Sequence, residues 1–103
     1  MMFFNRININ DAVEECRKTP NAVLLDVRED NEFHSGHIPG AVNIPLSRIN
    51  TINIPKDKAL YVYCLRGTRS KQAVSRLKAM GYQNVRSIGG ITAYKGTTEK
   101  QER

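Results

Sequence analysis

Nearly continuous apolar runs, rather than alternating ones, stand out along the chain. They cover residues 22–27 and 59–63, and a third core strand is predicted over residues 84–88. Runs of this length are typical of strands buried on both faces of a sheet. Weaker strand patterns occupy residues 3–9 and 41–44. The pattern therefore predicts a layered protein with a buried sheet.

Helical periodicity fills the segments between these runs. A helix is predicted over residues 11–18, with Asn8 or Asn10 as its N-cap and Pro20 enforcing its end. A second helix is predicted to begin at Ser70 and to be capped by Gly81, with an apolar stripe formed by Ala73, Val74, Leu77 and Met80. Shorter helical segments are expected near 28–34, 45–50 and 91–95. Strands alternating with helices predict an α/β fold with a mainly parallel sheet.

Length and composition limit the organisation of the chain. Its 103 residues, 40% hydrophobic and 25% charged, fit one globular domain. We assign this domain to residues 1–96. Residues 97–103 contain no apolar residue and are expected to form a disordered polar tail.

Charge and cysteine content limit the partners, cofactors and cellular locations to be expected. The net charge of +6 favours either an anionic small substrate or a merely solvated basic surface. Basic residues do not alternate with aromatic ones, so no nucleic-acid partner is expected. Cys16 and Cys64 lack metal-ligand spacing, so no metal or cofactor is expected. Without a secretory or membrane-spanning pattern, a cytoplasmic location with reduced thiols is expected.

Cys64 is the candidate nucleophile. It follows a buried strand and precedes a helix, separated from Ser70 by the loop Leu65-Arg66-Gly67-Thr68-Arg69. Such a loop presents free N–H groups at the positive end of the helix dipole, and Gly67 allows it to curl. With Arg66 and Arg69, these groups favour a thiolate and an anion beside it. The alternative is an inert cysteine at a strand end.

Three segments in order resemble the rhodanese family across residues 22–96. The first is Leu25-Asp26-Val27-Arg28-Glu29, continued by Glu32-Phe33 and Gly36-His37-Ile38-Pro39-Gly40-Ala41. The second is Tyr61-Val62-Tyr63-Cys64 with its loop to Arg69-Ser70, and the third is Gly81-Tyr82, Val85 and Gly89-Gly90. One departure is Tyr94, where many relatives carry Trp, which concerns packing more than chemistry.

The resemblance implies three layers, with a five-stranded, mainly parallel sheet between helices. It also implies a sulfurtransferase that carries sulfane sulfur as a persulfide on Cys64, the catalytic residue. The donor would be a small anion such as thiosulfate, bound by Leu65, Arg66, Gly67, Thr68 and Arg69, and the acceptor cyanide, a thiol or a protein. Asp26, Arg28 and His37 would hold loops together. For His37 a general-base role is the alternative, and for Cys16 the alternatives are a core position and a resolving thiol.

Two other functions compete with this interpretation. A Cys-dependent phosphatase or arsenate reductase carries five residues between its cysteine and arginine, whereas four separate Cys64 from Arg69. The shorter loop should leave no room for phosphate oxygens. The other alternative is a non-catalytic rhodanese-like binding module, whose typical sign, loss of the cysteine, is missing here.

Overall fold

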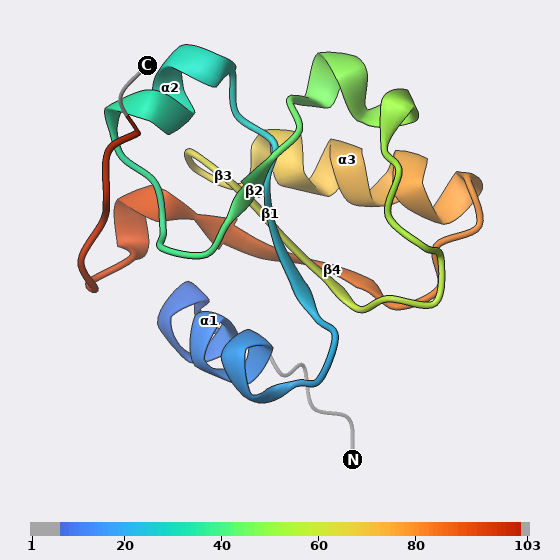
Figure 1. Cartoon of the computed structure of the whole chain (residues 1–103), viewed down its shortest axis with the longest axis horizontal. Helices are drawn as coiled ribbons and strands as arrows, with labels where there is room; N and C mark the ends of the chain where they lie inside the picture. Colours follow the sequence, from blue (N-terminus) through green and yellow to red (C-terminus); the bar gives the residue numbers. More distant parts are fainter. Residues whose placement is uncertain (1–6, 102–103) are drawn as a thin grey trace.

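The protein, seen here as a computed structural model, is described for residues 7–101. Parallel strands form one sheet in the order β2-β1-β3-β4. The strands are β1 (Val23–Asp26), β2 (Val42–Asn43), β3 (Leu60–Cys64) and β4 (Val85–Gly90). Figure 1 shows helices on both sides of the sheet. The predicted α/β fold with a parallel sheet is confirmed.

Helices connect the strands and cover the two faces of the sheet. The α-helices are α1 (Ile9–Lys18), α2 (Asp30–Ser35) and α3 (Thr68–Ala79), and the 3₁₀ helices are η1 (Leu46–Thr51) and η2 (Ile91–Ala93). α1 covers one face, while α3 and η1 cover the other (Figure 1). No helix in the described part of the chain is long and apolar enough to cross a membrane.

The predicted count of five strands is corrected to four within residues 7–101. The strand expected over residues 3–9 lies mostly outside the described residues. Its last part is not a strand, because Asn8 caps α1 by accepting a hydrogen bond from the Asp11 N–H at 2.9 Å. This cap places Ile9 in the first turn of the helix.

The central strand β3 sends alternate side chains into two cores. Tyr61 and Tyr63 pack in the core under α1, whereas Leu60, Val62 and Cys64 pack in the core under α3. This alternation places the sulfur of Cys64 on the α3 side of the sheet.

The described part of the polar tail is bonded to the domain. Glu99 and His37 exchange two backbone hydrogen bonds of 2.9 Å, and the Gln101 N–H donates to the His34 carbonyl at 3.1 Å. The expectation of a disordered tail is therefore wrong for residues 97–101. Main-chain pairing requires no apolar side chain, so hydrophobicity alone did not reveal it.

Candidate active site

Cys64 is the last residue of β3, at the carboxyl end of a strand flanked on both sides by neighbours. Its side chain is 1% exposed. The chain then turns sharply at Gly67, whose φ of +109° lies in the left-handed region. This turn starts α3 at Thr68, two residues earlier than predicted, because Gly67 serves as the N-cap.

Main-chain N–H groups of the loop point at the sulfur of Cys64. The Gly67 N–H donates to Sγ at 3.0 Å and the Ser70 N–H at 3.3 Å. Burial alone would raise the pKa of Cys64, but hydrogen bonds from the Ser70 hydroxyl and from the N–H groups of Ser70, Gly67 and Arg66 outweigh it. The pKa is therefore lowered from its ordinary value, which favours the nucleophilic thiolate.

The end of β4 and the start of η2 pack against the active-site loop. A Cβ built on Gly90 would lie 2.2 Å from the Leu65 carbonyl oxygen, so only glycine fits there. The Thr92 N–H and hydroxyl each lie 3.2 Å from the same oxygen. Gly89-Gly90 is part of the family pattern in the sequence, but the sequence does not link this pair to the site.

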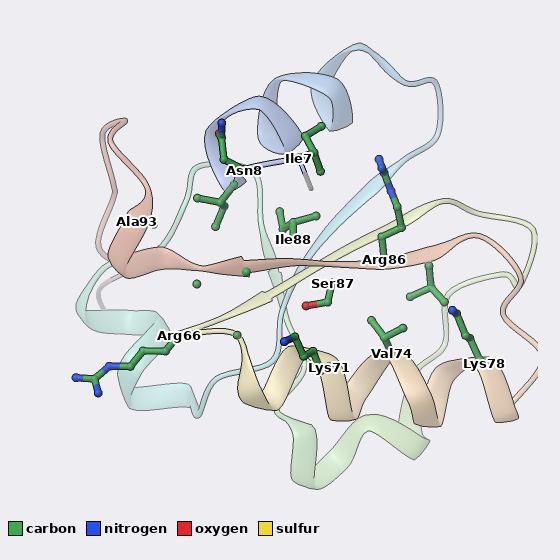
Figure 2. A pocket seen from close by; sticks show the side chains of 15 residues that line it. Ile7, Asn8, Arg66, Lys71, Val74, Lys78, Arg86, Ser87, Ile88 and Ala93 are labelled. Carbon is green, nitrogen blue, oxygen red and sulfur yellow. The ribbon is translucent and has the colours of Figure 1, made fainter. Parts of the chain in front are cut away.

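The two loop arginines have different surroundings. Arg69 makes two hydrogen bonds with Glu32 of α2, at 2.7 and 3.0 Å, and this pairing lowers the pKa of Glu32. Its charge is thus largely committed to holding the loop against α2. Arg66 is exposed, and Figure 2 shows its side chain extending away from the loop. That both arginines bind a donor stays a prediction, and for Arg69 it requires the pair with Glu32 to open.

The expected supporting residues form a closed network in the loop after β1. The Arg28 guanidinium donates to both oxygens of Asp26, with a shortest distance of 2.7 Å, and to the Gly36 carbonyl at 2.8 Å. The His37 ring stacks on Phe33 at 3.8 Å, and its Nδ1 lies 2.9 Å from the Phe33 carbonyl. These contacts brace α2, the helix that supplies Glu32.

A groove of about 690 Å³ begins at Arg66 and Gly67 and runs between α3, β4 and the start of α1 (Figure 2). Its lining includes four cationic side chains and, among the described residues, no acidic one. The cations are Arg66, Lys71, Lys78 and Arg86. Cys64 does not line this groove, so the groove borders the reactive loop without containing the sulfur.

The second cysteine lies in a different environment. Cys16 is on α1 and packs in the core on the opposite face of the sheet from Cys64. Its side chain is free of disulfide bonding, and burial raises the pKa of its thiol. Within residues 7–101, no three His, Cys, Asp or Glu side chains are arranged to hold a metal ion.

Comparison with known proteins identifies the family. Residues 10–97 match the family described as rhodanese-like domain, and the chain belongs to this family. A solved structure described as a rhodanese with anions from E. coli is 32% identical, with a TM-score of 0.70, and the match covers 78% of this chain and 99% of that one.

Two curated relatives illustrate the range of lengths in the family. Thiosulfate sulfurtransferase GlpE of Pseudoalteromonas translucida is 33% identical over 99% of this chain and 100% of its own length. The adenylyltransferase and sulfurtransferase uba4 of Ogataea parapolymorpha is 37% identical over 81% of this chain. This chain spans only 22% of the length of that larger protein.

Proposed function

We propose that this protein transfers sulfane sulfur from a small anionic donor such as thiosulfate to a thiophilic acceptor, through a persulfide on Cys64. The observation that carries the proposal is the loop geometry, in which the N–H groups of Gly67 and Ser70 lie 3.0 and 3.3 Å from Sγ. The name of the Pseudoalteromonas relative, a thiosulfate sulfurtransferase, supports the same donor.

The reaction proceeds in two displacement steps. The Cys64 thiolate attacks the outer sulfur of thiosulfate, a new S–S bond forms, and the S–S bond of thiosulfate breaks as sulfite leaves with the electron pair. An acceptor thiolate or cyanide then attacks the terminal sulfur of the persulfide and releases the Cys64 thiolate. Covalent catalysis thus divides one transfer into two easier ones. The loop N–H groups stabilise the negative charge without reorganisation. No general base is required, because the nucleophile is already a thiolate.

Basic side chains around the loop support an anionic donor. Arg66 extends from the loop without an ion pair among the described residues, and Lys71 follows on the first turns of α3. Their positive potential raises the local concentration of a dianion. The acceptor is a small thiol, cyanide or a protein thiol, in the cytoplasm where thiols stay reduced.

Phosphate chemistry fits this loop less well. With four residues between Cys64 and Arg69, the loop closes around a single sulfur atom. A phosphoryl group brings three peripheral oxygens that each need a donor. Arg69, the residue that would bind them, is already paired with Glu32.

The proposal is tested by assaying one preparation for two activities. The wild-type protein should release sulfite from thiosulfate in the presence of cyanide and show no turnover of an activated aryl phosphate. Cys64→Ser should abolish the first activity, with an unchanged circular dichroism spectrum, and Cys16→Ser should retain it. Absence of transfer with every sulfane donor tried, or Cys64-dependent phosphatase activity, would refute the proposal.

A further inference from the structure

The groove that borders the reactive loop concentrates unpaired positive charge. Of its four cations, Arg86 forms an ion pair with Glu15 of α1. Arg66, Lys71 and Lys78 are exposed and form no ion pair within the described part of the chain. Cations that line one concave surface reinforce each other's positive potential there and attract anionic partners. The groove is therefore suited to a negatively charged occupant.

The dimensions of the groove exceed those of a small anionic donor. Lys71 and Lys78 both line it from α3, and their positions on the helix are about 10 Å apart along its axis. The volume of about 690 Å³ lies within the range of roughly 300–1,000 Å³ found for pockets that hold organic ligands. Thiosulfate is much smaller than such ligands and could contact only one end. An elongated anionic occupant fits the groove better.

Apolar side chains among the cations favour a polypeptide over a nucleic acid as the occupant. Figure 2 shows Val74 between Lys71 and Lys78, with all three side chains directed from α3 toward β4. Ile88 lines the groove from β4. The described lining contains no aromatic side chain on which a base could stack. A chain segment that alternates acidic and apolar side chains would match both the charge and the apolar surface.

One end of the groove reaches the loop that holds the sulfur, because Gly67 lines it and donates its N–H to Cys64 Sγ at 3.0 Å. We propose that the groove docks an acidic, partly apolar segment of the protein that accepts sulfur, which brings the acceptor thiol to this end. The proposal rests on the proposed function. The acceptor thiolate attacks the terminal sulfur of the persulfide and keeps it as its own persulfide, and Cys64 leaves as the thiolate. Docking favours this acceptor over free small thiols, because it holds the two reactants together.

The first experiment measures docking without sulfur transfer. The probe is a fluorescein-labelled peptide of alternating glutamate and leucine residues that ends in cysteine, and its anisotropy is followed during titration with the Cys64→Ser protein. Lys78→Glu should weaken binding about tenfold, because it reverses a charge inside the groove. Lys78→Gln should weaken it less. Arg76→Glu is the matched control, since it reverses an exposed charge on the same helix outside the groove, and it should weaken binding by about twofold at most.

The second experiment compares the same peptide with cyanide as acceptors for thiosulfate-loaded protein that retains Cys64. Lys78→Glu should lower the ratio of kcat/KM for the peptide to that for cyanide about tenfold, and Arg76→Glu should preserve this ratio. Binding that depends on Lys78 without any sulfur transfer would refute the proposed function while confirming the groove as a site for acidic peptides. Equal binding of a lysine-leucine peptide, equal losses from Lys78→Glu and Arg76→Glu, or tighter binding of single-stranded DNA of the same charge would overturn the inference.

Discussion

The loops that follow β1 and β3 leave neighbouring parallel strands at the same edge of the sheet, yet they use their polar groups in opposite ways. After β1, Arg28 donates to the Asp26 carboxylate and to the Gly36 carbonyl in a buried network. After β3, the N–H groups of Gly67 and Ser70 have the sulfur of Cys64 as a common acceptor. The paired charges after β1 therefore indicate a structural role. The main-chain donors after β3, which converge on one sulfur, indicate a reactive site.

A first way to sharpen this comparison is to break the network after β1. Asp26→Ala leaves the Arg28 guanidinium, 5% exposed, without its counter-charge. Removing one partner of a buried pair costs about 3 kcal/mol of the free energy of unfolding. Urea denaturation should show this loss, while kcat per folded molecule stays within about threefold of wild type, as expected for a change in stability alone.

The matching change after β3 should have the reverse effect. Cys64→Ser should leave the free energy of unfolding from urea denaturation within about 1 kcal/mol of wild type, as for a substitution that retains shape, and eliminate transfer. If Asp26→Ala abolished turnover in fully folded protein, the separation between a structural and a reactive loop would fail.

A second prediction concerns the support behind the reactive loop. Gly90→Ala would place a Cβ against the Leu65 carbonyl, so the loop must shift and the N–H groups must lose their aim at Sγ. We expect kcat/KM to fall about thirtyfold, on the order of 2 kcal/mol of transition-state stabilisation.

The neighbouring glycine provides the matched control. Gly89→Ala meets no atom within 4 Å, but its φ of +106° makes the backbone strained. It should therefore lower stability by about 1 kcal/mol and spare activity. Equal losses of kcat/KM in the two variants would show that strain in β4, rather than contact with Leu65, controls the loop.

Sequence patterns were sufficient for most of this architecture. The apolar runs located β1 and β3, a separate strand prediction located β4, and the Cys64-Gly67 spacing located the reactive loop, because all three depend on local residue order. The pairing of Arg69 with Glu32 joins residues 37 positions apart, and the contact of Gly90 with Leu65 also joins distant segments. Their partners depend on how α2 and β4 pack, which local patterns do not encode.

A third prediction follows from the lowered pKa of Cys64. Alkylation in the Cys16→Ser protein should have a midpoint below the value of about 8.5 for a free cysteine. Because the folded pKa lies below the unfolded one, the thiolate contributes stability that is fully present above the unfolded pKa and is lost as pH falls through the folded pKa. A midpoint at or above the free value would contradict the role given to the loop donors.

The smallest expected effect separates the two arginines. Arg66→Ala should raise the KM for thiosulfate severalfold with kcat nearly unchanged, because an exposed charge contributes binding that is equal in the ground and transition states. Arg69→Ala should instead lower kcat and be reproduced by Glu32→Gln, since the two side chains form one pair. Indistinguishable effects of Arg66→Ala and Arg69→Ala on KM would show that the ion pair opens when the donor binds.

The central claim, that Cys64 carries sulfur, is tested most directly by the intact mass of the protein after incubation with thiosulfate. The account predicts the addition of one sulfur atom, mapped to the peptide containing Cys64 and removed by a reductant. Cys64→Ser should show no addition. An adduct on Cys16, or an unchanged mass with thiosulfate and every other sulfane donor, would contradict it.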